Sequence, residues 1–154
     1  MQNQTSKYNA LLEMSILLHE LCKCPLLNKD AETSLTTVQA RATTIVAHFE
    51  PEGITIQQLS KILKLSSGAT SKLVDRIARD GIIQRIPSET DRRSVVLHVT
   101  KLAHSLSAFS NEKAETFLNL LMNDYPEKER NAYLEFNRKF TERIWELVKS
   151  QSKV

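Results

Sequence analysis

Three charged residues, Asp91, Arg92 and Arg93, stand together in the segment SETDRRSVVLHVT, residues 88–100. The guanidinium group of arginine is weakly hydrated and planar, so it suits phosphate oxygens and the narrow, electronegative minor groove of DNA. An adjacent carboxylate can hold such a guanidinium by charge-assisted hydrogen bonds and reduce the entropy lost on binding. An ordinary polar turn is the alternative interpretation. The elements on either side of these residues decide between the two.

A second group of polar and basic residues stands shortly before, in SSGATSKLVDRIARDG, residues 66–81. The pattern predicts a helix that begins at the serines and is closed by a glycine at the C′ position. Small residues and backbone N–H groups at a helix start allow a DNA duplex to approach closely, and cations on the same face can bind phosphate or guanine. In the alternative, the serines only cap the helix and the cations are solvated. The residues expected on this face are Ser66, Ser67, Gly68, Ser71, Lys72 and Arg76.

Other residues of this predicted helix have roles inside the domain. Leu73, Val74 and Ile77 follow the helical period and are expected in the core. A carboxylate on a DNA-binding face would repel phosphate. We therefore expect Asp75 to have a partner within the chain.

The positive charge of the chain is unevenly distributed. The chain has 154 residues, the size of one domain, with an ordinary globular composition and a net charge of +3. Residues 55–93 contain eight Lys and Arg against four Asp and Glu, whereas the rest of the chain contains 13 and 14. Such an asymmetry indicates a polyanionic partner for this quarter of the chain.

The order of the predicted elements is that of a winged helix-turn-helix. Gly and Pro are rare and fall mainly where the apolar period stops or changes. Helices are expected at 6–23 and 36–49, followed by a helix that a Thr55/Gln58 capping box opens and by the helix at 66–81. β-branched runs on both sides of Asp91–Arg93 predict a hairpin, and long helices at about 101–123 and 127–150 meet at Pro126. The predicted fold is mainly α with a small β-hairpin wing.

The segment LVDRIARDGIIQRIPSETDRRSVVLHVTKLA resembles the signature of the MarR (multiple antibiotic resistance regulator) family of bacterial transcription regulators. The resemblance covers Leu35 to Thr100, and the order of helices agrees over the whole chain. It implies that residues 66–76 read the DNA major groove while the hairpin tip reaches the minor groove or the backbone. The chain departs from the family pattern at Ala103, where glycine is usual, and at Thr70, where an aliphatic residue is usual. The matching residues are Leu73 to Ile77, Gly81, Arg85, Asp91 with Arg93, and Val99-Thr100.

The first helix and the last two helices carry more apolar surface than a small winged domain can cover. We therefore expect a homodimer in which residues 1–34 and 101–154 form the helical dimerisation region, while residues 35–100 form the DNA-binding domain. The family resemblance further implies a small aromatic or phenolic effector, bound where the dimer helices meet the winged domain, that weakens DNA binding. The apolar residues of the last two helices are Leu102, Leu106, Phe109, Phe117, Leu120, Leu121, Tyr133, Phe136, Phe140, Ile144 and Leu147.

Other function classes have little support in the sequence. Cys22 and Cys24 lie two residues apart on a predicted helix and point to opposite sides, so inert packing is expected, with redox sensing as the alternative. No metal-ligand cluster, Gly-rich phosphate loop or nucleophile motif indicates a metal, a cofactor or catalysis. No secretory signal or membrane span is expected, and a cytoplasmic protein is predicted.

We predict a DNA-binding regulator, a repressor rather than an activator. The rival hypothesis is a small-molecule or metal-binding interaction protein that kept the fold without an operator.

Overall fold

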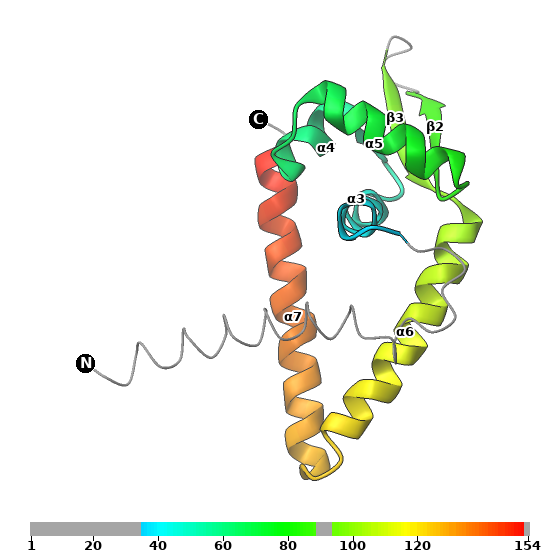
Figure 1. Ribbon diagram of the computed structural model, residues 1–154. Helices are drawn as coiled ribbons and strands as arrows, with labels where there is room; N and C mark the ends of the chain where they lie inside the picture. The colour runs from blue at the N-terminus through cyan, green and yellow to red at the C-terminus, as the bar shows by residue number, and fades with distance from the viewer. Residues whose placement is uncertain (1–34, 89–93, 153–154) are drawn as a thin grey trace. The chain divides into compact units, whose positions relative to one another are not determined.

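The computed structural model describes residues 35–88 and 94–152. The predicted helix at 6–23 and the cysteines at its end, Cys22 and Cys24, lie outside the described residues, and so does the hairpin tip with Asp91, Arg92 and Arg93. The described elements are α3 (Thr37–His48), β1 (Ile54–Thr55), α4 (Ile56–Leu63), α5 (Ser67–Arg79), β2 (Ile83–Pro87), β3 (Val95–Val99), α6 (Lys101–Leu121) and α7 (Glu127–Ser152) (Figure 1).

Helices α3 and α4, which precede α5, both begin with a capping box. The Thr36 hydroxyl accepts a hydrogen bond from the Gln39 N–H (3.3 Å), and the Gln39 side chain accepts one from the Thr36 N–H (2.8 Å). Thr55 and Gln58 exchange the same pair of bonds at the start of α4. Each box satisfies two N–H groups that a helix start leaves without an intrahelical acceptor. The predicted Thr55/Gln58 capping box is confirmed.

Helix α5 begins and ends where the sequence predicts. The Ser66 hydroxyl accepts a hydrogen bond from the Ala69 N–H (3.2 Å), which makes Ser66 the N-cap. At the other end, the N–H of Gly81 donates to the Ala78 carbonyl (3.0 Å) and that of Ile82 to the Ile77 carbonyl (3.1 Å). These two hydrogen bonds form a Schellman motif, which requires a left-handed backbone at Gly81, where φ is +72°.

The sheet has three antiparallel strands in the order β1-β3-β2. The predicted hairpin is confirmed as β2 and β3, with Ile83 opposite Val99 and Pro87 opposite Val95. Strand β1 was not predicted, because two residues are too few to show an alternating pattern. It pairs Ile54 with Leu97 and so attaches the α3–α4 connection to the wing.

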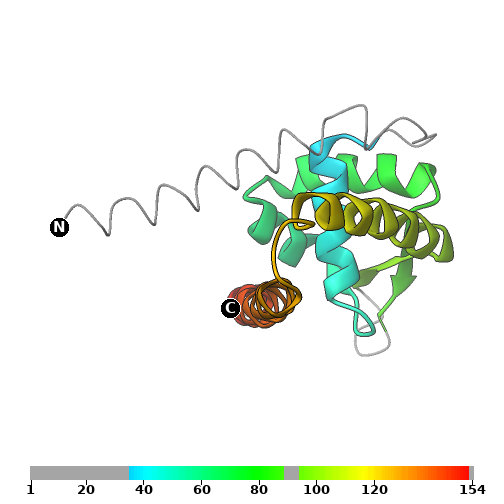
Figure 2. The same cartoon turned by 90° about the horizontal axis from the view of Figure 1, so that it is seen from below.

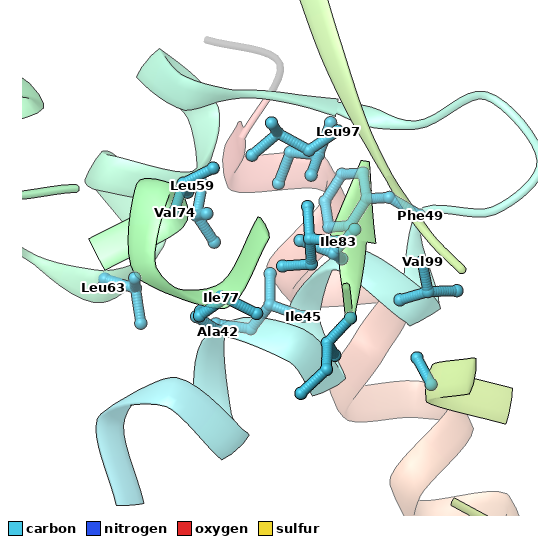
Figure 3. Packing of buried hydrophobic residues seen from close by; sticks show 14 residues of the cluster. Ala42, Ile45, Phe49, Leu59, Leu63, Val74, Ile77, Ile83, Leu97 and Val99 are labelled. Carbon is cyan, nitrogen blue, oxygen red and sulfur yellow. The ribbon is translucent and has the colours of Figure 1, made fainter. Parts of the chain in front are cut away.

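One apolar core joins α3, α4 and α5 to the sheet (Figure 3). Val74 and Ile77 on α5 are fully buried, and Leu73 is partly buried against them, as predicted. Thr70 is also fully buried, but its hydroxyl donates to the Ser66 carbonyl (3.0 Å). A buried hydroxyl with a hydrogen-bond partner costs little, so this departure from an aliphatic residue is accommodated within the helix.

The loop after α3 is fixed to strand β3 by a carboxylate. Glu50 Oε2 lies 2.9 Å from His98 Nδ1, and Glu50 Oε1 accepts a hydrogen bond from the Val99 N–H (2.9 Å). Gly53 packs directly against this pair, with a φ of +73°. A Cβ at this position would lie 2.6 Å from His98 Nε2, closer than atoms in real structures approach. This loop therefore requires glycine both for its backbone conformation and for space.

Replacing Gly53 with alanine should lower the free energy of unfolding by about 2–4 kcal/mol, because the left-handed backbone and the contact with His98 both penalise a side chain. Urea denaturation of the two proteins measures this difference. Gly68→Ala is the matched control, since a Cβ there has no atom within 4 Å and the position is helical. Equal effects of the two substitutions would show that the loop tolerates a side chain.

Helices α6 and α7 lead away from the winged domain and back to it (Figure 1). The C-terminal part of α7, viewed along its axis in Figure 2, packs near α3 through a His48–Trp145 stack with 3.8 Å between ring centroids. Much of the apolar surface of both helices is nevertheless exposed, although Leu106 packs against the core. The side chains of Phe109 and Phe117 lie outside the described residues. The exposed residues are Leu102, Leu120, Leu121, Tyr125, Tyr133, Leu134, Phe136, Phe140, Ile144 and Leu147.

Candidate nucleic-acid interface

Helix α5 has one buried face and one exposed polar face. Its buried residues are Thr70, Val74 and Ile77, which anchor the helix to the core. A spacing of four places Gly68, Lys72 and Arg76 on one side of the helix. The predicted residues on this side are all exposed except Ser71, which is half-buried; they are Ser66, Ser67, Gly68, Ser71, Lys72 and Arg76.

The start of α5 can receive an anion. The Ser66 hydroxyl is engaged by the Ala69 N–H, so this serine caps the helix. The N–H groups of Ser67 and Gly68 precede the first intrahelical bond and point out of the helix start. The space in front of Gly68 is open, because no atom lies within 4 Å of a Cβ built there. A phosphate could therefore approach the backbone at this point.

Asp75 is neutralised by an ion pair within the domain. Arg85 Nη2 on β2 donates to Asp75 Oδ1 over 2.7 Å, which confirms that Asp75 has an intramolecular partner. The pair joins α5 to the first strand of the hairpin. It also reduces the repulsion that a lone carboxylate beside Arg76 would exert on a phosphate. Because both side chains are partly exposed, the ion pair contributes little to the free energy of unfolding. Its main effect is to orient α5 relative to β2.

Four cations on and just before α5 have no ion pair among the described residues, whereas three cations on α7 do. Within residues 35–88 and 94–152, no ion pair involves Lys72 or Arg76, and the same holds for two exposed lysines of the preceding segment, Lys61 and Lys64. These two lysines are not among the predicted site residues, although they contribute to the excess positive charge of residues 55–93. Unpaired exposed cations next to an open helix start form a surface suited to a polyanion.

Six charged residues in the middle of α7 pair with one another. Arg138 bonds both Glu135 and Glu142, and Lys139 also reaches Glu135. Hydrogen bonds from Arg138 and Lys139 lower the pKa of Glu135 to about 2. Arg143 pairs with Glu146 in the same way. The positive and negative charges of this middle part of α7 are therefore balanced within the helix.

The hairpin tip remains a prediction. Strands β2 and β3 stay paired up to Pro87 and Val95, and the Ser88 N–H donates to the Ser94 carbonyl (2.9 Å). The five residues beyond, including Asp91, Arg92 and Arg93, lie outside the described residues. Strand β2 of this hairpin is held to α5 by the hydrogen bond from Arg85 to Asp75.

The histidines of the described chain have structural surroundings. His98 lies in hydrogen-bond contact with Glu50 and His48 stacks on Trp145, while His104 is exposed on α6. Burial and the nearby Lys149 ammonium both lower the pKa of His48. Among the residues with described positions, no group of three or more His, Cys, Asp or Glu side chains could hold a metal ion. None of the described helices is both long enough and apolar enough to cross a bilayer.

Comparison with known proteins finds similarity to the MarR family. Residues 33–94 match the model of the MarR family. A curated relative from Bacillus subtilis (strain 168), the uncharacterized HTH-type transcriptional regulator YybA, is 23% identical over 112 residues, which are 71% of this chain and 75% of that protein. Both findings agree with the resemblance to the MarR family that the sequence shows. The relative is named as a transcriptional regulator, the role that the sequence resemblance implies for this chain.

Solved structures share the fold of this chain. A MarR family protein from Bacillus stearothermophilus superimposes with a TM-score of 0.70 at 19% identity, covering 94% of this chain and 97% of that one. Streptococcus pneumoniae FabT, solved in complex with DNA, superimposes with a TM-score of 0.60 at 18% identity, covering 96% of this chain and 99% of that one. The predicted winged helix-turn-helix fold is confirmed.

Proposed function

We propose that this protein is a transcriptional regulator, a repressor rather than an activator, that binds pseudo-palindromic operators as a homodimer. Helix α5 enters the major groove, and the hairpin tip reaches the minor groove or the adjacent backbone. The observation that carries the proposal is the exposed face of α5, where cations without described ion pairs stand opposite a fully buried face. The proposed DNA-binding residues are Ser66, Ser67, Gly68, Ser71, Lys72, Arg76, Asp91, Arg92 and Arg93.

Dimerisation is supported by the apolar surface that the described chain leaves exposed. Phe136 and Phe140 stack on each other with 5.6 Å between their ring centroids, yet 63% and 52% of these residues are exposed. A stripe of this kind on a long helix needs a partner surface. We assign residues 1–34 and 101–154 to the dimerisation region and residues 35–100 to DNA binding. Two-fold symmetry then presents two copies of α5 to successive major grooves.

Regulation and location complete the proposal. A small aromatic or phenolic effector binds where the dimer helices meet the winged domain and changes the spacing of the two α5 helices, which weakens operator binding. The protein acts in the cytoplasm. The DNA complex of FabT, a protein of the same fold, supports the assignment of DNA as the partner.

Selection of bound fragments from the source organism's own genomic DNA tests this function. The purified protein should enrich a small set of fragments that share a pseudo-palindromic sequence, with half-sites about one helical turn apart. Recovery of random fragments only would instead favour the rival hypothesis, an interaction protein without an operator.

Arg93→Ala should lower affinity for the selected operator at least about tenfold, because each minor-groove arginine contributes on the order of 1–3 kcal/mol and the dimer makes the contact twice. Arg93→Lys should restore it only in part, since an ammonium lacks the planar fork that Asp91 can orient. Arg92→Ala should be milder and should mainly flatten the salt dependence. Operator titrations with parallel melting curves measure both quantities.

The melting curves are the control for the hairpin. The tip is expected outside the core, so the melting temperature should hardly change in any of the three variants. Unchanged DNA binding by Arg93→Ala, or a loss of binding that follows a loss of stability, would make Asp91–Arg93 an ordinary polar turn.

A further inference from the structure

Lys64 occupies a backbone conformation that favours glycine. It is the C-cap of α4, with φ 56° and ψ 41°, in the left-handed region. Among the described residues, the other positions with positive φ are Gly53 and Gly81. An L-residue with a Cβ is disfavoured in this region, and lysine has no short polar side chain that could compensate by bonding its own backbone.

The fold uses the backbone of Lys64 and not its side chain. The Lys64 N–H donates to the Lys61 carbonyl (3.3 Å), and the following Leu65 N–H donates to the Ser60 carbonyl (3.0 Å). These bonds close the turn between α4 and α5, and any residue that adopts the left-handed conformation can make them. The Lys64 side chain is exposed and has neither an ion pair nor a hydrogen bond within the described chain. The turn alone would therefore favour glycine over lysine.

The turn lies next to the open start of α5. Lys64 stands two residues before Ser66, the N-cap of α5, and so shortly precedes in the sequence the outward-pointing N–H groups of Ser67 and Gly68. In helix-turn-helix docking, the first helix crosses the DNA backbone and the second enters the major groove by its N-terminal end. The connecting turn then lies at the edge of the groove, beside phosphates. A lysine ammonium suits a phosphate as a point charge that carries no base preference.

We propose that Lys64 is a phosphate-anchoring residue: its ammonium contacts the DNA backbone at the groove edge, beside the N-terminal end of α5. The left-handed lysine is then a position where a binding contact outweighs a local cost in stability. This inference rests on the proposed DNA-binding function. It adds a contact that positions the recognition helix but does not read sequence.

The Lys64→Gly variant separates the effect of the left-handed backbone on stability from the effect of the ammonium on DNA binding. The variant should melt at the same or a higher temperature than wild type, because glycine relieves the left-handed backbone. Its binding should depend less steeply on salt, with the slope of log affinity against log salt reduced by about two for a dimer. Between 50 and 200 mM salt, wild type should therefore lose about tenfold more affinity than the variant does. The preference for operator over scrambled DNA should stay the same.

Three further variants complete the test. Lys64→Asn, which tolerates the left-handed conformation, should behave as Lys64→Gly does, and Lys64→Arg should keep the wild-type salt slope. Lys128→Gln removes one exposed cation from the first turn of α7 and should leave the slope nearly unchanged. A wild-type slope and affinity in Lys64→Gly would overturn the phosphate contact while leaving DNA binding by α5 intact. Absence of DNA binding by wild type would overturn the proposed function itself.

Discussion

A variant carrying Phe136→Asp and Phe140→Asp should sediment as a monomer at micromolar concentration, where the wild type sediments as a dimer. Both rings are more than half exposed in the single chain, so the substitutions remove no core contact of the winged domain. In a dimer the same positions would bury charges without partners, which is strongly unfavourable. Operator affinity should fall by about 100-fold or more, because the second half-site is no longer held near the first.

Lys128→Asp with Asn131→Asp is the matched control on α7. It also introduces two carboxylates at exposed positions of this helix, but it removes no apolar surface. The control protein should remain a dimer and bind operator as wild type does. A compact, stable monomer of the wild-type protein at micromolar concentration would refute dimerisation through these helices.

The combined substitution of Lys72 and Arg76 by alanine should nearly abolish operator binding. If each side chain contributes on the order of 1–3 kcal/mol and each is present twice in a dimer, affinity should fall by more than about 100-fold. The melting temperature should be maintained, because both side chains are exposed and alanine is a good helix former. Titration of the genomically selected operator, with a melting curve for each protein, measures both effects.

Lys128→Ala with Arg143→Ala removes the same charge from α7 and serves as the control for long-range electrostatics. This variant should keep most of its affinity, since only the general attraction of the protein for DNA is reduced. Equal losses in the two double variants would mean that net charge, and not the face of α5, determines binding.

Local signals in the sequence predicted the fold closely. Thr55 with Gln58 and Ser66 with Gly81 mark helix ends through side chains and backbone conformations that act within a few residues, so they can be read without tertiary structure. The two-residue strand β1 could not be predicted in this way, because its pairing with Leu97 depends on a partner more than forty residues away. The same is true of the Glu50 carboxylate that binds His98 and the Val99 N–H.

The candidate site was predictable in its residue types but not in its contacts. The helical period distinguishes the exposed Lys72 and Arg76 from the buried Val74. The sequence also indicates that Asp75 needs a partner, but its choice of Arg85 depends on how the hairpin lies against α5. Lys64 escapes prediction for another reason. Nothing in its local sequence marks a left-handed backbone, which glycine or asparagine would have signalled.

The most direct test of the proposed DNA recognition is a titration of the wild-type protein across a salt series. Its selected operator is compared with a scrambled duplex of equal length and composition. Operator binding should be at least about 1,000-fold tighter at physiological salt, and both affinities should fall linearly on a log–log plot as salt rises. Equal affinity for the two duplexes, or affinity that does not change with salt, would contradict sequence-specific DNA binding.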